Sequence, residues 1–393
     1  MLSMLKHVSK PIRWIFAGLV LVMLANCQMG VPITGGQGQS LIDGEAVPVA
    51  LLVPHGSTSA EEQLLARDLE NAARLAVSDL SGVAIDLRVY GTAGNATQAQ
   101  NVAIQAVDEG AKIIVGPLHA ASANAVAVSM APRNVNVMAF SNNPTIAGGN
   151  LFVLGQTFDT TADRLTGYAV SQGKRRIMTV YSDNVAGELG RNAISRAVSS
   201  RGAQSAGSVT YEFSQQGVIG AVPAITSTAQ TNQADSIFLT ANTAGALPLF
   251  TQMLPEAGLP PENIQYIGLA RWDQPRQTLE LPGVQEGWFA IPDPQRETQF
   301  RSRFQSAYGN PPHALAGLSY DAIAAIGALA QSGRSDALSR GNLVQPAGFQ
   351  GVNGIFRFRS DGTTDRGLAV VTVRERELFV LSPAPSSFSG GGF

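Results

Sequence analysis

Short apolar runs and segments with helical periodicity alternate through the first part of the chain. Residues 49–53 form a continuous apolar run, as expected of a strand buried on both faces of a parallel sheet. Ser59 and Glu62 then have capping-box spacing. They are followed at helical spacing by the apolar stripe Leu65, Leu69, Ala72, Ala76 and Leu80. These patterns predict a buried strand and then an amphipathic helix.

The same rhythm continues to about residue 290. Ile85, Leu87 and Val89 alternate with polar residues, which predicts a half-buried strand at a sheet edge. A helix is predicted at residues 96–109, and Gly110 can adopt the left-handed backbone conformation that often ends a helix. Further strands are expected at 113–115, 135–140, 151–154, 177–182, 206–212, 236–240 and 264–269, with helices between them, one at 121–131. Strands that alternate with helices predict an α/β fold of doubly wound parallel sheets.

The segment 48–290 is long enough for two such sheets, so the sequence predicts two doubly wound parallel-sheet lobes around a cleft. We place the first change of lobe near Phe158, where the strand at 151–154 gives way to a polar stretch. In open α/β sheets, ligands bind outside the carboxyl ends of the strands. The residues just past the strands are therefore the candidate ligand site.

The first 27 residues have the composition of a secretory signal. Lys6, Lys10 and Arg13 precede an apolar segment that is too short to span a bilayer. The segment ends in Leu-Ala-Asn-Cys27, which resembles the bacterial lipobox, although Asn26 stands where a smaller residue is usual. The resemblance implies that 1–27 is a lipoprotein signal peptide and that Cys27 receives the lipid. The alternative is an ordinary cleaved signal peptide with an incidental cysteine.

Gln28 follows the cysteine, whereas an aspartate there would indicate retention in the inner membrane. The expected location is the periplasm, with lipid anchoring to the outer membrane. Residues 28–47 are rich in glycine and glutamine and predict a flexible tether. Residues 384–393, rich in Pro, Ser and Gly, predict a disordered tail.

Composition excludes several classes of function. The 393-residue chain has a net charge of −2 and no basic block, so we expect no nucleic-acid partner. It has one cysteine, which excludes an internal disulfide and a cysteine-based metal site. His55, His119 and His313 are not at ligand spacing, and we expect no metal and no cofactor. No later apolar run reaches the length of a membrane span, so we expect contact with the membrane through the lipid alone.

Polar residues follow six of the predicted strands, and they are suited to hydrogen-bonding a small polar ligand. The candidate ligand residues are His55, Ser57, His119, Ser122, Ser141, Asn142, Asp183, Asn184, Asn242, Arg271 and Trp272. The alternative is that they cap helices and fill turns. His55 and His119 are expected either to face each other at the strand ends or to act as paired helix caps.

Three features resemble the leucine-binding, type I periplasmic binding family: the apolar run 49–53 followed by a capped helix, GAKIIVGPLHAAS at 110–122 and YDAIAAIGALA at 320–330. In that family the chain crosses three times between the lobes. The resemblance therefore implies that 48–158 and 291–348 form lobe 1, and that 159–290 and 349–383 form lobe 2. It also implies a receptor that delivers an amino acid or a similar small molecule to an ABC importer.

Other segments look like alphaproteobacterial lipoproteins grouped as penicillin-binding protein activators. They are VNVMAFSNNPTIAGGNLFVLG at 135–155, RWDQP at 271–275, GWFAIPDPQ at 287–295 and YGNPPHALAGLSYDAI at 308–323. This closer resemblance implies a protein that docks on a peptidoglycan synthase. Amino-acid-binding members usually have a Ser where this chain has Ala120, and a Thr where it has Asn142. These differences weaken the amino-acid signature.

Enzyme motifs are incomplete. Ser171-Gln-Gly-Lys174 and Ser182-Asp-Asn184 match two β-lactamase signatures, but no lysine follows residue 174 to form the third. The sequence also lacks a G-x-S-x-G elbow, a phosphate loop and a G-x-G-x-x-G motif. We therefore expect a non-catalytic protein. The main hypothesis is a regulator of peptidoglycan synthesis that binds a penicillin-binding protein, and the alternative is a receptor for an ABC importer permease.

Overall fold

The structure is a computed structural model that describes residues 38–388. Its first sheet is five-stranded and parallel, in the order β2-β1-β3-β4-β5. The strands are β1 (Val47–Val53), β2 (Ile85–Gly91), β3 (Ile113–Val115), β4 (Asn136–Ala139) and β5 (Leu151–Val153). The helices of this lobe are α2 (Ala60–Asp79), α3 (Ala96–Asp108), α4 (Ala120–Met130), α9 (Pro294–Tyr308), α10 (Ala316–Ala330) and the short α11 (Arg340–Leu343).

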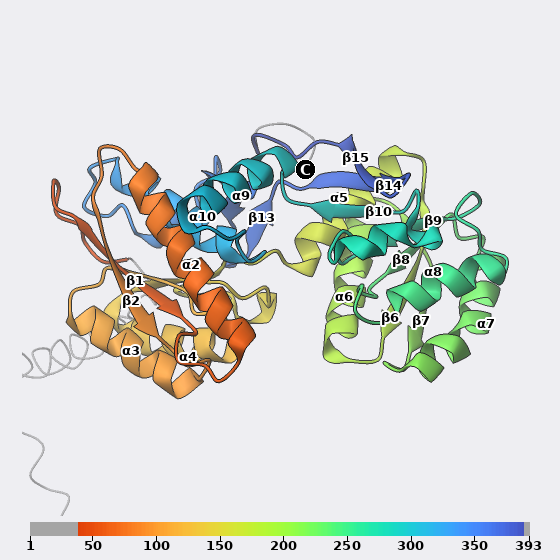
Figure 1. Cartoon of the computed structure of the whole chain (residues 1–393), viewed down its shortest axis with the longest axis horizontal. Helices are drawn as coiled ribbons and strands as arrows, with labels where there is room; N and C mark the ends of the chain where they lie inside the picture. Colours follow the sequence, from red (N-terminus) through yellow and green to blue (C-terminus); the bar gives the residue numbers. More distant parts are fainter. Residues whose placement is uncertain (1–37, 389–393) are drawn as a thin grey trace, which may run out of the picture. The chain divides into compact units, whose positions relative to one another are not determined.

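Both faces of this sheet are covered, as the apolar run at 49–53 predicts. Val49, Leu51 and Val53 face a core that includes α2 and α10, whereas Ala50 and Leu52 face α3 and α4. Helices α2 and α10 lie side by side (Figure 1). The Ser59 hydroxyl caps α2 by accepting a hydrogen bond from the Glu62 backbone N–H at 3.3 Å. Burial on both faces explains why the strand lacks polar residues.

The second sheet has seven strands in the order β15-β14-β10-β9-β8-β6-β7. They are β6 (Arg176–Ser182), β7 (Gln204–Tyr211), β8 (Ser236–Leu239), β9 (Gln265–Gly268), β10 (Trp288–Ile291), β14 (Ala369–Arg374) and β15 (Glu377–Ser382). Five are parallel, while β14 and β15 are antiparallel. Helices α5 (Phe158–Ser171) and α6 (Val185–Ser200) cover one face, and α7 (Gln215–Thr231) and α8 (Leu247–Glu256) cover the other.

Short 3₁₀ turns occur at Ala131–Arg133, Pro144–Ile146, Arg276–Glu280 and Pro282–Val284. The strands and helices predicted from the pattern are confirmed within a few residues. The predicted α/β fold class with two parallel-sheet lobes is confirmed as well. Helices bury one face and strands bury one or both faces, and each type of burial leaves its own hydrophobic period in the sequence. These elements could therefore be predicted from the sequence pattern.

A third, antiparallel sheet corrects the predicted division of the chain. It contains β11 (Phe349–Gly351), β12 (Gly354–Phe358) and β13 (Thr364–Arg366). Phe349, Phe356 and Phe358 belong to the core of the first lobe. The sequence predicts a return to the second lobe at residue 349. The structure shows that the chain returns only after β13. The apolar residues of 349–358 could pack against either lobe, so the sequence alone does not show which core receives them.

The predictions for the chain ends are corrected where the structure describes them. Residues 38–46, expected as part of a flexible tether, pack on the first lobe. The Leu41 N–H donates to the Ser335 carbonyl at 2.8 Å, and the Leu41 side chain contacts the core. Residues 384–388, expected as disordered, pack on both lobes: Ala384 contacts the core of the second lobe, whereas Ser386 and Phe388 contact the third sheet. The signal peptide, Cys27 and the rest of the tether lie outside the described residues.

Candidate ligand-binding site

The parallel strands of each lobe end at one edge of the sheet, and the predicted site residues follow them there. In the first lobe they come after β1, β3 and β4, and in the second lobe after β6, β8 and β9. This placement agrees with the rule for ligand sites in open α/β sheets. The contacts of each side chain show which of them are available to a ligand.

Three of the predicted residues stabilise local backbone. The Ser57 hydroxyl accepts from the Ser59 N–H at 3.2 Å, and the Ser141 hydroxyl accepts from the Asn143 N–H at 3.1 Å. Asn184 is the N-cap of α6 and accepts from the Gly187 N–H at 2.8 Å. These contacts are the turns and caps of the alternative explanation.

The two histidines do not form a pair with each other. His55 Nε2 lies 2.9 Å from Glu70 Oε2, and His119 Nε2 lies 2.9 Å from Glu62 Oε1. Both glutamates belong to α2, eight residues or roughly 12 Å apart along its axis. The capping box is not completed, because the Ser59 N–H donates to the Ser57 hydroxyl and the Glu62 carboxylate meets His119.

Glu70 also binds Arg74, whose Nε lies 2.9 Å from its Oε1. Partial burial acts to raise the pKa of the Glu70 carboxyl. The hydrogen bonds from His55 and Arg74 outweigh that effect and lower the pKa overall. The Glu70 carboxylate is therefore kept ionised by its neighbours and is engaged by two of them.

Helix α4 begins at the carboxyl end of β3 and has no side-chain cap. His119 occupies the N-cap position, but its ring makes no hydrogen bond to the helix. The first turn carries Ala120 and the buried Ser122. The first N–H groups of a helix have no partner within it, and they carry a partial positive charge. The end of α4 can therefore accept an anionic group.

Two exposed amides remain at the strand ends. Asn142 follows β4, and Asn242 follows β8. Neither side chain makes a hydrogen bond within residues 38–388. Asp183 is also exposed, but its Oδ1 accepts from the Phe213 N–H at 3.1 Å. The amides are therefore the predicted residues with the most freedom to bind a ligand.

Arg271 is engaged by carboxylates from two directions. Its Nη2 lies 2.6 Å from Asp273 Oδ2, and its Nη1 lies 3.4 Å from Glu297 Oε1 on α9. Burial alone lowers the pKa of the guanidinium, but the hydrogen bonds and charges of Asp273 and Glu297 outweigh burial and raise it. Arg271 connects the end of β9 to α9 and is not a free anchor for a ligand.

Trp272 is wrongly predicted as a ligand residue. Its side chain is 0% exposed and lies in the core of the second lobe, with its ring centroid 5.8 Å from that of Phe289. Gly268 and Gly287 make room for it, since a Cβ at either position would come within 2.4 Å of the indole ring. Burial of the large apolar ring outweighs its place in the sequence just after a strand.

Sequence reasoning missed a buried ion pair between α10 and β13. Asp321 Oδ2 lies 2.9 Å from Arg366 Nη1, and both side chains are at most 3% exposed. Arg366 also donates to the Leu154 carbonyl at 2.9 Å, which connects β13 to the end of β5. The sequence does contain one indication of this pair, because Asp321 is the only carboxylate in the apolar segment 316–330.

Residues 38–388 contain no group of three or more His, Cys, Asp or Glu side chains arranged to hold a metal ion. In the same part of the chain, no helix combines the length and apolarity needed to cross a membrane.

The sequence profile of the periplasmic binding protein family matches residues 46–377, so the chain belongs to this family. Membership implies a periplasmic location. Periplasmic binding proteins are receptors rather than enzymes, which agrees with the non-catalytic expectation. No curated protein matches the sequence.

Several solved structures share the fold. One is a Rhodospirillum rubrum protein provisionally assigned to a branched-chain amino acid ABC transporter (18% identity, 86% of this chain and 100% of that chain, TM-score 0.74). A second is an ABC transporter substrate-binding protein of Desulfitobacterium hafniense in complex with Leu (18%, 86% and 100%, TM-score 0.63). A third is an R. palustris solute-binding protein in complex with benzoate (16%, 88% and 99%, TM-score 0.58).

Proposed function

We propose that the protein is a periplasmic receptor that binds a small organic carboxylate and presents it to the permease of an ABC importer. The observation that carries this proposal is the uncapped N-terminus of α4 at the carboxyl end of β3. Its N–H groups and dipole favour a carboxylate there. The exposed Asn142 adds a polar side chain at the same sheet edge.

The ligands of two structural relatives support this chemical class. Leucine and benzoate share a carboxylate and differ in everything else. Since those relatives are under 20% identical to this chain, they support the fold directly and the ligand class only by analogy.

Ala120 limits the affinity that we expect. A serine hydroxyl at this position would donate to a carboxylate, and a charge-assisted hydrogen bond of that kind contributes about 1.5–3 kcal/mol. Its loss corresponds to roughly one to two orders of magnitude in affinity. We therefore expect weaker binding than in receptors that carry the serine.

A second candidate is a regulator of peptidoglycan synthesis that docks on a penicillin-binding protein. It is favoured by Ala120 and by the internal contacts that occupy most strand-end side chains, those of Ser57, Ser141, Asn184 and Arg271 among them. A fold that no longer needed a ligand would retain such residues for capping alone. The resemblance of 135–155 and 308–323 to activator lipoproteins supports the same candidate.

A thermal-shift screen separates the two candidates. The chain starting at Gln28 would be heated with amino acids, benzoate and related aromatic acids at millimolar concentration. A ligand at 100 times its Kd adds about 2.7 kcal/mol to the unfolding free energy, which is easily detected. A shift with a carboxylate, absent with the matching amide, supports the receptor. No shift with any compound, together with stimulation of a purified peptidoglycan synthase, supports the regulator.

We also propose that Cys27 carries a lipid that holds the protein at the outer membrane. Cys27→Ser should then move the protein from the membrane fraction to the soluble fraction, because lipidation supplies the apolar anchor. Density separation of the two membranes tests the sorting. Membrane retention of Cys27→Ser would contradict lipid anchoring without bearing on the ligand site.

A further inference from the structure

The C-terminal residues that follow β15 contact both lobes, starting with the second. Arg164 of α5 donates to the Ser382 hydroxyl at 2.7 Å and to the Pro383 carbonyl at 3.3 Å. The same guanidinium donates to the Leu368 carbonyl at 2.8 Å. Ala384 packs against the core of the second lobe. Arg164 thus fixes the base of the tail beside the link between β13 and β14.

The middle of the tail lies against that link. The Pro385 carbonyl oxygen is 2.9 Å from the place where a Cβ would stand on Gly367. Any side chain at position 367 would therefore displace the tail. The tail and the link between β13 and β14 run next to each other where the chain passes from one lobe to the other.

The tip of the tail binds the third sheet, which belongs to the first lobe. The Gln350 amide donates to the Ser386 carbonyl at 3.0 Å. The Arg357 guanidinium lies 4.4 Å from the centroid of the half-buried Phe388 ring. A Cβ on Gly348 would come within 2.8 Å of that ring. These contacts form a seat for an aromatic side chain on β11 and β12 and the preceding turn.

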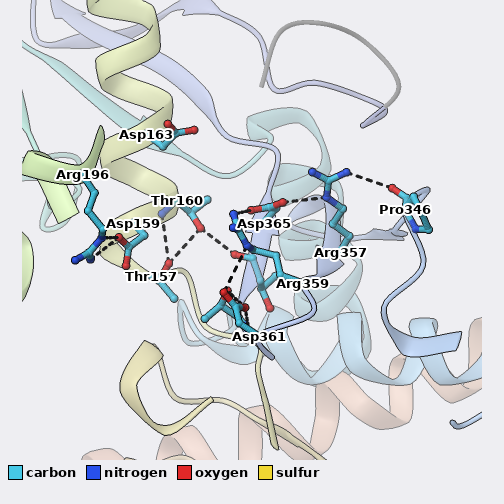
Figure 2. A network of polar contacts seen from close by, with 12 residues as sticks. Thr157, Asp159, Thr160, Asp163, Arg196, Pro346, Arg357, Arg359, Asp361 and Asp365 are labelled. Atoms are coloured by element: carbon cyan, nitrogen blue, oxygen red, sulfur yellow. Dashed lines mark hydrogen bonds and ion pairs between the residues drawn. The ribbon is translucent and has the colours of Figure 1, made fainter. Parts of the chain in front are cut away.

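Arg357 is itself held in place. Its Nε lies 2.9 Å from Asp365 Oδ2, and its Nη1 donates to the Pro346 carbonyl at 3.5 Å (Figure 2). Asp365 also binds Arg359, at 3.3 Å. A guanidinium fixed in this way keeps one face available for a cation–π contact with Phe388.

We propose that residues 383–388 form a strap, a fourth connection between the lobes that restrains their relative movement. Only three residue steps separate Pro383 from Ser386, and an extended chain spans at most about 11 Å over that length. Pro383 and Pro385 fix their own φ angles, which stiffens the strap further. A hinge movement of the lobes therefore has to release either the Phe388 seat or the Arg164 anchor.

The test uses soluble chains that start at Gln28, with spin labels at Val128→Cys on α4 and Ser199→Cys on α6. Both positions are exposed, and the native Cys27 is absent from these chains. The inter-label distance distribution is compared for chains ending at Phe393, Phe388 and Pro383, and for Phe388→Ala. The chain ending at Phe388 is the matched control, since it keeps every strap residue.

We expect equal distributions for the chains ending at Phe393 and Phe388, and broader ones for the chain ending at Pro383 and for Phe388→Ala. Amide hydrogen exchange in residues 348–357 should become about tenfold faster in the last two. If the chain ending at Pro383 fails to fold, Phe388→Ala alone decides. Unchanged distances and unchanged exchange in a folded Phe388→Ala would overturn the strap. The result does not depend on which ligand or partner binds.

Discussion

Helices α4 and α6 stand at comparable places, each after a parallel strand, yet their first turns differ. In α6 the N-cap Asn184 accepts from the Gly187 N–H and from the Ser182 hydroxyl. In α4 the N-cap His119 turns to Glu62, and no side chain caps the helix. A polar residue after a strand therefore says little by itself. A helix end that its own chain leaves uncapped is the better indication of a ligand site.

Trp272→Ala should have the largest effect on stability. It tests whether this strand-end residue of the second lobe has a structural role. Removing a fully buried indole should lower the unfolding free energy by about 3–5 kcal/mol. Chemical denaturation measures this loss, and Trp272→Phe, which retains an aromatic ring, should lose less. A stable Trp272→Ala with weakened ligand binding would instead return this residue to the ligand site.

Asn184→Ala should have an intermediate effect. Loss of the N-cap should cost about 1 kcal/mol of stability without changing the affinity for a carboxylate ligand. Asn142→Ala, which removes an exposed amide that has no partner in the described part of the chain, is the matched comparison. Asn142→Ala should leave stability unchanged and lower the affinity for the carboxylate ligand. If the two variants showed the opposite effects, our assignment of capping and binding roles would be wrong.

Glu70→Gln should have the smallest effect, and that effect should depend on pH. The pKa of Glu70 is lowered by folding from its usual 4.5, so ionised Glu70 stabilises the fold above that pH. This contribution is lost as the pH falls through the lower, folded pKa. The melting temperature of the native chain should therefore exceed that of Glu70→Gln at pH 7, and the two should converge in acid. Glu61→Gln, which alters an exposed residue of the same helix, is the control; a pH-independent difference for Glu70→Gln would contradict the predicted linkage.

The strands and helices could be predicted because burial repeats with a fixed period. The continuous apolar run of β1 and the alternating pattern of β2 each report how many faces of the strand are covered. The third sheet could not be assigned to a lobe in this way. Phe349 on β11 and Phe356 on β12 are apolar residues that either core could receive.

The candidate site was harder to predict, since a residue's place after a strand does not fix the direction of its side chain. Trp272 turns into the core, and His119 turns to a glutamate 57 residues earlier in the chain. The contact of Phe388 could not be predicted from the sequence. The Pro-, Ser- and Gly-rich segment around it predicts disorder, even though this single aromatic residue anchors the segment.

The most direct test of a carboxylate site at α4 is isothermal titration of the native chain and Ala120→Ser with the best acid from the screen. A hydroxyl in the first turn of α4 should add a hydrogen bond to the carboxylate and lower the Kd by about tenfold or more. Ala125→Ser, five residues further along α4 and beyond its first turn, should leave the Kd unchanged. Equal affinity of all three chains, or equal tightening by both serines, would contradict binding at the end of α4.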